Sequence, residues 1–375
     1  MKKIFVRLGR NPHTAYNYIV KFKSKKYFLK FPNYLNNIAL KEPKIKIKLK
    51  NIFWKSLSKL VLIPKLKVNL NNIDLIHSTN NILLSTSNNW ILDTEYFGGL
   101  INFNYSKLNE KINYLINIFK SNNFKGIIFW SNAAKKSFTR KIPDLNLKNK
   151  LFVLKPCVGV SKKVKQKKKL KKILFIGKNF YEKGGLHVIN VFLNLIEKYP
   201  FLQLTIVSDL KSIQKDVLSI NKGVKFYDFN LSVEDINKLY LDNDLFFFPT
   251  FMDTYGMVIL EAKAYGLPVI TTNCFACPEI ITNKKEGFIV KSSFLWHDKD
   301  YFFDFSKYSS WDDFSLKSKD YCDNHFDKEL FNKIEFLIKN PKQFSKFSKN
   351  CIVNSKKSQK VYERKLDFIY LRCLK

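Results

Sequence analysis

The clearest pattern of apolar and polar positions lies in the second half of the chain. Leu245–Phe248 is wholly apolar, as in a strand buried on both faces, and Pro249 ends it because proline donates no ladder hydrogen bond. Helical spacing follows over residues 257–265 and stops at Gly266, and Val269–Thr272 has the pattern of the next buried strand. This order predicts a parallel βαβ unit, which binds ligands at the carboxyl ends of its strands.

Comparable patterns run along the rest of the chain and form two alternating series, which predicts an α/β fold with two Rossmann-like domains. In the first half, we expect strands at 3–8, 27–31, 60–68, 73–77, 90–95, 126–130 and 151–154, with helices at 104–121 and 133–138. In the second half, we expect strands at 172–177, 202–208, 224–229 and 287–290, and helices at 184–198, 233–241 and 356–375.

A strongly basic run at residues 161–170 separates the two series. So many lysines cannot enter a core, so the run is interpreted as a linker. We therefore expect a basic first domain at 1–165, a second domain at 166–350 and a C-terminal helix at 351–375.

Charge is distributed unevenly between the two halves. The 375 residues carry a net charge of +35, from 61 Lys and 5 Arg against 31 acids. An AT-rich genome would produce part of this lysine excess, but it would act on both halves alike. Residues 1–170 nevertheless carry +29 and residues 171–375 only +6, which indicates an anionic surface facing the first half.

Several classes of protein are disfavoured by composition. The six cysteines show no compact disulfide framework, so a reducing cytoplasm is expected. Cys274 and Cys277 have zinc-ligand spacing, but they lack a second ligand pair, and close packing is the simpler interpretation. We expect no signal peptide, no transmembrane helix and no nucleic-acid motif.

The loop and helix after Pro249 carry the candidate chemistry. A helix that begins near Gly256 offers free N–H groups and a positive dipole end to a phosphate. Glu261, one turn into that helix, can accept two hydrogen bonds from a vicinal diol such as a ribose, and Asp253 lies in the loop. The alternatives are an ordinary surface acid at Glu261 and a helix cap at Asp253.

This segment resembles the E-x7-E region of retaining GT-B glycosyltransferases of family 4. The resemblance is carried by Asp253 and Glu261, eight residues apart, with Tyr255-Gly256 between them and an Ala-x3-Gly-Leu-Pro-Val-Ile sequence after Glu261. The family usually has Glu at the position of the first acid. Because Asp253 is shorter, the resemblance does not determine which sugar hydroxyl it contacts, and hence which donor is used. The resemblance implies a GT-B fold: two Rossmann-like domains facing across a cleft, with a C-terminal helix that crosses back to the first.

The resemblance extends to a turn at residues 177–185, GKNFYEKGG, which is similar to the family's G-R-x4-K-G turn. Lys183 matches its donor-phosphate lysine, and Lys178 stands where Arg is usual, which keeps the charge but loses the bidentate fork. The first domain matches only loosely, with Gly9 alone where most members have a glycine-rich loop. The donor-binding residues implied are Lys178, Lys183, Gly184, Tyr255, Gly256, Met257, Val258, Glu261 and Glu279.

Two acids stand out in the first domain because it contains only six. Asp93 and Glu95 close a predicted strand, where alternation would send both to one face. One of these two acids could accept a proton from an acceptor hydroxyl or orient it. Together with Asp253 and Glu261, they are the candidate catalytic residues. A helix cap or an ion pair with lysine is an equal alternative. His77 ends another strand, where it faces the cleft or is simply buried.

These features together predict transfer of a sugar from a nucleotide-diphosphate donor to a saccharide or lipid-linked acceptor, with retention, in cell-surface glycan synthesis such as that of polysaccharide or lipopolysaccharide. No cofactor and no metal are expected. The expected location of the protein is the cytoplasm, and peripheral binding to the inner face of the membrane is the alternative. The alternatives are another GT-B enzyme, such as a nucleotide-sugar epimerase or a phosphorylase, and a non-catalytic basic module that binds anionic membrane or nucleic acid.

Overall fold

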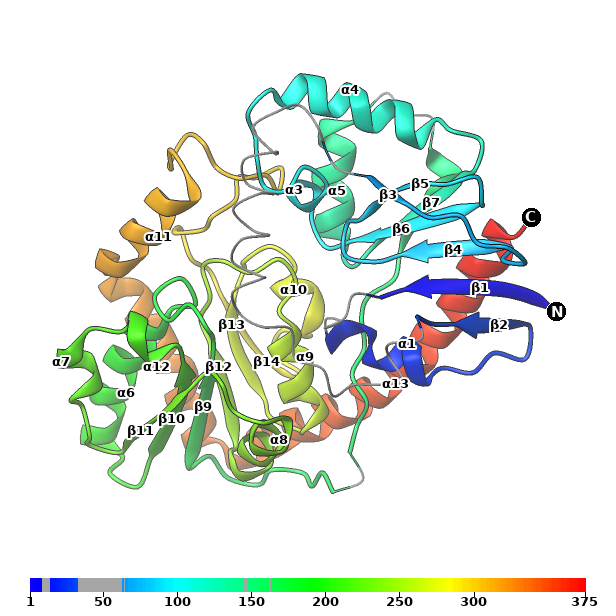
Figure 1. Cartoon of the computed structure of the whole chain (residues 1–375). Helices are drawn as coiled ribbons and strands as arrows, with labels where there is room; N and C mark the ends of the chain where they lie inside the picture. The colour runs from blue at the N-terminus through cyan, green and yellow to red at the C-terminus, as the bar shows by residue number, and fades with distance from the viewer. Residues whose placement is uncertain (9–13, 33–62, 64, 144–146, 162) are drawn as a thin grey trace. The chain divides into compact units, whose positions relative to one another are not determined.

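The chain forms two compact units (Figure 1). The computed structural model describes residues 1–8, 14–32, 63, 65–143, 147–161 and 163–375. Gly9 and residues 60–62 and 64 of the expected strand 60–68 lie outside these residues. Unit 1 comprises Met1–Pro156, Asp300–Phe302 and Val361–Lys375, and unit 2 comprises Cys157–Lys299 and Phe303–Lys360.

Unit 2 is built on a six-stranded sheet in which every pair is parallel. Its strand order is β11-β10-β9-β12-β13-β14. All four residues of β12 are buried, as the apolar run predicts. The strands are β9 Lys172–Ile176, β10 Gln203–Ser208, β11 Val224–Asp228, β12 Leu245–Phe248, β13 Val269–Thr272 and β14 Gly287–Val290.

Helices follow most of these strands, and their ends carry the expected signals. The Ser232 hydroxyl accepts the N–H of Asp235 and so caps α8, as predicted. Gly266 adopts a left-handed φ of 77° just after α9. The sequence interpretation missed α7, α10 and α11. The helices are α6 Gly185–Lys198, α7 Lys215–Leu218, α8 Val233–Asp242, α9 Met257–Ala264, α10 Cys277–Ile280, α11 Trp311–Asp320 and α12 Asn324–Lys339.

The strand order of unit 2 reverses between β9 and β12. From β9 the chain winds outward through β10 and β11, and it then returns to the other side of β9 to form β12. The loops that leave β9 and β12 therefore start from neighbouring strands at the same edge of the sheet. In open parallel sheets such a reversal is where ligands bind.

Unit 1 is also wound around a six-stranded parallel sheet, with the order β2-β1-β4-β6-β7-β8. A separate parallel pair joins β3 to β5. Its strands are β1 Lys2–Arg7, β2 Tyr27–Lys30, β3 Lys65–Lys67, β4 Leu75–Ser78, β5 Leu83–Ser85, β6 Trp90–Thr94, β7 Phe124–Phe129 and β8 Leu151–Val153. Its helices are α1 Asn17–Lys21, α3 Phe97–Leu100, α4 Leu108–Phe119 and α5 Asn132–Lys141.

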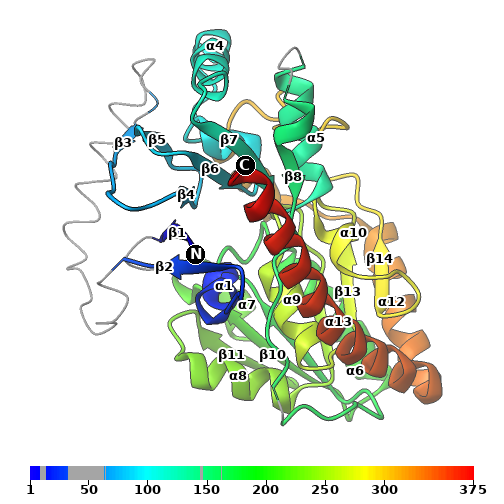
Figure 2. The same cartoon turned by 90° about the vertical axis from the view of Figure 1, so that its right-hand side faces the viewer.

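One long helix, α13 (Pro341–Cys373), contributes to both units (Figure 2). It begins well before the terminal helix expected at 356–375. Its last part belongs to unit 1, where the hydroxyl of Tyr18 donates to Glu363 at 2.7 Å and that of Tyr27 donates to Asp367 at 2.6 Å.

The basic run at 161–170 has no helix or strand in its described residues, but it packs against unit 2 instead of hanging free. The backbone N–H of Lys167 donates to Ser348 Oγ at 2.8 Å, and the side chain of Gln166 donates to Ser345. Leu170 is buried. Four lysines of this run are exposed, Lys163, Lys165, Lys168 and Lys169, whereas the ammonium of Lys167 donates to the backbone oxygen of Leu241. The division between the two compact units falls after Pro156, before this run.

Candidate functional site

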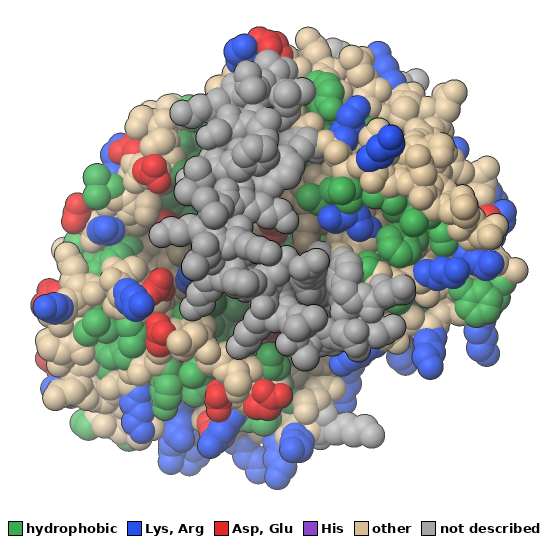
Figure 3. Space-filling view, in the orientation of Figure 1, with side chains coloured by type: hydrophobic (Ala, Val, Ile, Leu, Met, Phe, Trp, Pro, Cys, Tyr) green, Lys and Arg blue, Asp and Glu red, His purple; other side chains and the backbone are tan. Residues whose placement is uncertain are grey.

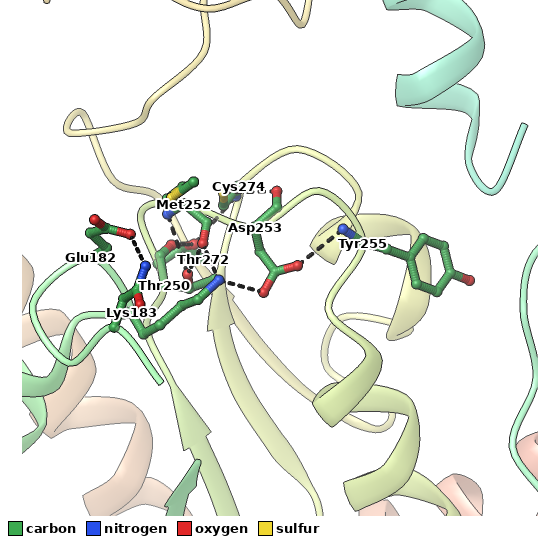
Figure 4. Close-up of polar contacts among 9 residues, drawn as sticks. Glu182, Lys183, Thr250, Met252, Asp253, Tyr255, Thr272 and Cys274 are labelled. Carbon is green, nitrogen blue, oxygen red and sulfur yellow. Dashed lines mark hydrogen bonds and ion pairs between the residues drawn. The ribbon is translucent and has the colours of Figure 1, made fainter. Parts of the chain in front are cut away.

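An ion pair lies at the strand reversal of unit 2 (Figure 4). Lys183, in the loop between β9 and α6, places its Nζ 2.9 Å from Oδ2 of Asp253 in the loop after β12. The same Nζ donates to the backbone oxygen of Met252. The two side chains are 18% and 16% exposed, so opposite charges meet in a partly screened position that still reaches solvent.

Gly184 allows the two loops to approach. Its φ is 79°, and a Cβ there would lie 2.2 Å from the backbone oxygen of Pro249. Any other residue would push the β9–α6 loop away from the end of β12. The glycine after Lys183 thus sets the distance at which Lys183 meets Asp253.

The pKa of Lys183 reflects this pairing. Burial by itself would lower the pKa of the ammonium, but the charge and the hydrogen bond of Asp253 outweigh burial and raise it. The ammonium therefore stays charged across the physiological range and is available to an anion that replaces or joins Asp253.

Asp253 also orders the loop that leads into α9. Its Oδ1 accepts the backbone N–H of Tyr255 at 3.0 Å, an Asx-type turn, and Gly256 follows with a φ of 90° as the residue before the helix. The alternative of Asp253 as the N-cap of α9 is wrong, because Gly256 holds that position. Met257 and Val258 open the helix, whose positive end lies beside this turn.

Glu261 is half-buried on α9, unlike an ordinary surface acid. Its Oε2 accepts a hydrogen bond from the Tyr240 hydroxyl at 3.0 Å, and Tyr240 stacks on Tyr265 with ring centroids 5.3 Å apart. Burial and the charge of Glu261 raise the pKa of Tyr240 well above its usual range, so the phenol keeps its proton and donates it. This contact fixes the direction of the carboxylate.

Two further donor-site candidates are Lys178, on the β9–α6 loop, and Glu279, on the helix after β13. The side chain of Lys178, after β9, is exposed, and its backbone oxygen accepts the N–H of Asp209 at 3.2 Å. Glu279 is half-buried on α10, and after burial its charge is the next cause of the raised pKa of Tyr255. The structure thus brings Lys183, Asp253, Tyr255 and Gly256 together at one edge, with Lys178 on the β9 loop and Glu279 on the helix after β13.

The first-domain acid Asp93 belongs to a buried hydrogen-bond network in unit 1. Its Oδ1 accepts hydrogen bonds from the Tyr16 hydroxyl at 2.7 Å and the Asn80 backbone N–H at 3.0 Å. His77 Nε2 lies 3.3 Å from Asp93 Oδ2, outside hydrogen-bond geometry, while its Nδ1 lies 2.7 Å from the Tyr370 hydroxyl. Asp93 is 3% exposed, so this carboxylate is engaged by its own unit.

A small cavity adjoins these hydrogen-bonded residues. The other candidate first-domain acid, Glu95, follows Asp93 by two residues. The cavity has a volume of about 20 Å³, enough for one water molecule, and its lining includes Tyr16, His77 and Asp93. Glu95 is half-buried, and its charge contributes to the raised pKa of Tyr16. Because β6 ends at Thr94, strand alternation does not fix the direction of Glu95.

Three partners in these clusters were missed from the sequence. Tyr240, Tyr16 and Tyr370 contact their acids or histidine across 21, 77 and 293 residues respectively. No local signal marks them, since isolated tyrosines look alike in a sequence. Among the described residues, no group of three or more His, Cys, Asp or Glu is arranged to hold a metal ion, and no helix is long and apolar enough to cross a bilayer.

Comparison with known proteins finds a family match within unit 2. Residues 160–298 match the family described as glycosyl transferases group 1. An uncharacterized glycosyltransferase of Haemophilus influenzae is 26% identical over 174 residues, 44% of this chain and 47% of that protein. The capsular polysaccharide biosynthesis glycosyltransferase CapM of Staphylococcus aureus is 27% identical over 121 residues, 31% of this chain and 32% of that protein. The chain thus spans less than half the length of these curated relatives.

A solved structure resembles the chain over nearly its whole length. Anabaena HepE, crystallised with UDP, superposes with a TM-score of 0.60 at 13% identity and covers 98% of both chains. At this identity the likeness shows the fold alone. The fold is GT-B, with two Rossmann-like units, as predicted.

Proposed function

We propose that this chain is a glycosyltransferase that takes its sugar from a nucleotide-diphosphate donor bound to unit 2. The observation that carries the proposal is the Lys183–Asp253 pair, at 2.9 Å, on the strand reversal where an open parallel sheet binds ligands. That reversal lies inside the segment that matches glycosyl transferases group 1. The proposal includes membership of family 4 and retention of the anomeric configuration.

In the proposed complex the diphosphate lies against Lys183 and the first turn of α9. Lys183 is already charged and desolvated, and the N–H groups of Met257 and Val258 have no partner within their own helix at its start. These groups, with Lys178 from the same β9–α6 loop as Lys183, face the negative charge that develops as the diphosphate leaves. Stabilising that charge is the main catalytic work, and no metal is needed for it.

Glu261 is proposed to hold the ribose of the donor. A carboxylate has about four acceptor sites, and the hydrogen bond from Tyr240 fixes the direction of this one, which suits Glu261 to accept hydrogen bonds from the two hydroxyls of a diol. Tyr240 then acts as a positioning residue. Asp253, whose Oδ2 pairs with Lys183, and Glu279 are proposed to contact the sugar side of the donor.

The reaction itself is proposed to occur on one face of the sugar. The bond from the anomeric carbon to the diphosphate oxygen breaks, the acceptor oxygen bonds to the same face, and the departing phosphate oxygen takes the acceptor proton. This route leaves the anomeric configuration unchanged and needs no protein base.

Unit 1 is proposed to receive a saccharide or lipid-linked acceptor, as in polysaccharide or lipopolysaccharide synthesis. Residues 1–170 carry a net charge of +29, and separate Lys and Arg side chains with few acids are scattered over the part of unit 1 coloured in Figure 3, which suits an acceptor that carries phosphate or lies on an anionic membrane. Since Asp93 is engaged within unit 1, Glu95 is the acid we expect to contact the acceptor hydroxyl, with Asp93 in support.

A nucleotide panel tests the proposal. Thermal unfolding of the chain with UDP, GDP, ADP or TDP should show stabilisation by at least one of them, and Glu261→Ala should remove that shift and donor-dependent turnover. The charge of unit 1 favours a second candidate, a basic module without catalysis. Stabilisation by anionic vesicles or DNA, with none of the four nucleotides effective, would replace the enzyme by that module.

A further inference from the structure

A pair of cysteines brackets the turn between β13 and α10, directly behind the Asp253 loop. The backbone N–H of Cys277 donates to the backbone oxygen of Cys274 at 2.8 Å, and Phe275 within the turn has a φ of 38°. A turn closed in this way brings the first and fourth Cα atoms within about 7 Å. Disulfides span Cα distances of about 4.4–6.8 Å, so the backbone separation in this turn is compatible with one.

The two thiols differ in chemical character. Burial by itself would raise the pKa of Cys274, but the hydrogen bond from Cys277 and the proximity of His297 outweigh it and lower that pKa to about 6. The hydrogen bond to Cys274 and burial raise the pKa of Cys277 well above its usual range. The two sulfurs therefore differ in acidity, and Cys274 is the one that more readily forms the thiolate, which is the nucleophilic form of cysteine.

His297 and Phe275 hold this turn in place. The backbone N–H of Phe275 donates to His297 Nε2 at 2.8 Å, and His297 Nδ1 lies 2.8 Å from the backbone oxygen of Asp298, to which it donates. The ring of Phe275 lies 5.2 Å from that of Trp296. The cysteine pair is thus part of a well-packed cluster, with both thiols wholly buried.

The pair also touches the proposed donor site. Cys274 Sγ lies 3.7 Å from the backbone oxygen of Asp253, whose carboxylate pairs with Lys183 (Figure 4). A Cβ on Gly256, the residue that precedes α9, would lie 3.5 Å from Cys277 Sγ. Movement of either sulfur therefore acts on the loop that carries the acid and the helix end.

We propose that Cys274 and Cys277 form a reversible disulfide with a peroxide as oxidant, and that this disulfide weakens nucleoside diphosphate binding to unit 2. The second half of this inference rests on the proposed function, and the first half does not. A C-x-x-C pair in a reducing compartment is a common form of redox site.

The chemistry needs no other co-reactant. The Cys274 thiolate attacks one peroxide oxygen, the O–O bond breaks, and a sulfenic acid and a hydroxide form. The hydroxide takes up the proton that the Cys274 thiol had released and becomes the first water. The Cys277 sulfur then attacks Cys274 Sγ, the S–O bond breaks, and the leaving hydroxide takes the Cys277 proton as the second water. Two thiols lose two electrons and two hydrogens, and the peroxide becomes two waters. A dithiol reverses the step by exchange.

The expected effect on the donor site follows from the position of the sulfur. A disulfide requires a torsion of about 90° around its S–S bond, which draws Cys274 Sγ toward Cys277 and away from Asp253. The loop then loses a packing contact beside Lys183. A coupling between two such adjacent sites is typically about fivefold or more in affinity.

The experiment oxidises the full chain with hydrogen peroxide and reads two quantities. Peptide mass mapping should show a 274–277 disulfide, with the loss of two hydrogens, and dithiothreitol should remove it. Calorimetry with the nucleoside diphosphate that stabilises the reduced chain should show about fivefold weaker binding after oxidation and recovery after reduction.

Two variants control the experiment. Cys322 is the exposed cysteine of the six, so Cys322→Ser removes the most accessible thiol and should leave both results unchanged. Cys274→Ser should form no disulfide and keep its affinity in peroxide. If that variant does not fold, Cys274→Ala and the oxidised and reduced wild-type chain give the same comparison.

Peroxide treatment that produces no 274–277 disulfide would overturn the proposal, as would a mapped disulfide that leaves the affinity within about twofold. If the reduced chain binds none of the nucleotides, the proposed function and the coupling fail together, while the mapped disulfide still decides the redox site on its own.

Discussion

The two units share one way of winding a sheet and differ in what they place at its reversal. Each has six parallel strands whose order turns around at an inner strand, β9 in unit 2 and β1 in unit 1. In unit 2 the loops at that edge bring together Lys183 and Asp253, with side chains 18% and 16% exposed. In unit 1 the carboxylate of Asp93 lies one strand beyond the reversal, near the end of β6, where it is 3% exposed and accepts a hydrogen bond from Tyr16.

This difference indicates two roles for a carboxylate near the carboxyl ends of the strands. Asp253 shares its charge with a lysine that an incoming anion can also reach, so its partners can change when a ligand binds. Asp93 is satisfied by donors of its own unit. Removing it would take a buried acceptor from the Tyr16 hydroxyl and leave the Asn80 N–H with its hydrogen bond to the Tyr16 oxygen. The topology creates a site in each unit, and the side chains decide whether the site is open.

The largest expected effect is on catalysis at the unit 2 reversal. Lys183→Ala should lower donor-dependent turnover by about 100-fold or more, because it removes a fixed charge from the leaving diphosphate. Lys225→Ala is the matched control, since it removes the same charge from an exposed position on β11. Steady-state rates of the two variants measure the effect, and equal rates would remove the distinction between the two units.

The next effect concerns stability in unit 1. Asp93→Ala should lower the free energy of unfolding by about 3 kcal/mol, because Tyr16 and the Asn80 N–H lose a buried acceptor. Asp253→Ala, at the partly exposed pair, should cost about 1 kcal/mol or less. Urea unfolding of both variants checks this order, and a reversed order would contradict the assignment of Asp93 as the structural acid.

A smaller effect is expected at Lys178. Its side chain is exposed on the loop after β9, so it approaches a bound diphosphate from solvent. Screening limits what such a charge contributes, and Lys178→Ala should lower turnover by about tenfold or less. A loss as large as that of Lys183→Ala would show that the two lysines act as equal partners. Added salt should reduce the contribution of Lys178 more than that of Lys183.

The two units should also differ in how their buried cysteines respond to pH. The pKa of Cys274 in unit 2 is lowered to about 6, while burial raises the pKa of Cys373 in unit 1 to about 12. Since the thiolate reacts, modification of Cys274 should increase as the pH rises through about 6, and Cys373 should stay unreactive up to pH 9.

Peptide-resolved alkylation measures this difference. The groups that face Cys274 are Cys277, His297 and Asp253, with Lys183 acting on Cys277, so His297→Gln should shift the midpoint upward. A midpoint near 8.5, the ordinary value for cysteine, would mean that the unit 2 cluster does not stabilise the thiolate.

The sequence was a good guide where local signals decide the structure. The run Leu245–Phe248, the helix after Gly256 and the strand Val269–Thr272 form as predicted, because period, proline and glycine act within a few residues. Asp253 and Lys183 were chosen separately, and the parallel pairing of β9 with β12 brings them together.

What escaped prediction depends on distant partners. Tyr370 reaches His77 across 293 residues, and no pattern in either neighbourhood announces the contact. The spacing of Cys274 and Cys277 was visible, yet their unlike thiols depend on His297, which packs against the turn from another segment. Local periodicity carries no information on such tertiary contacts.

Calorimetry of a nucleoside diphosphate against its parent nucleoside tests the central claim most directly. If Lys183 and the start of α9 bind the phosphates, the diphosphate should bind the wild-type chain at least about tenfold tighter than the nucleoside, and Lys183→Ala should remove most of that difference. Equal affinity of the wild-type chain for the two ligands, or a difference that Lys183→Ala leaves intact, would contradict the account.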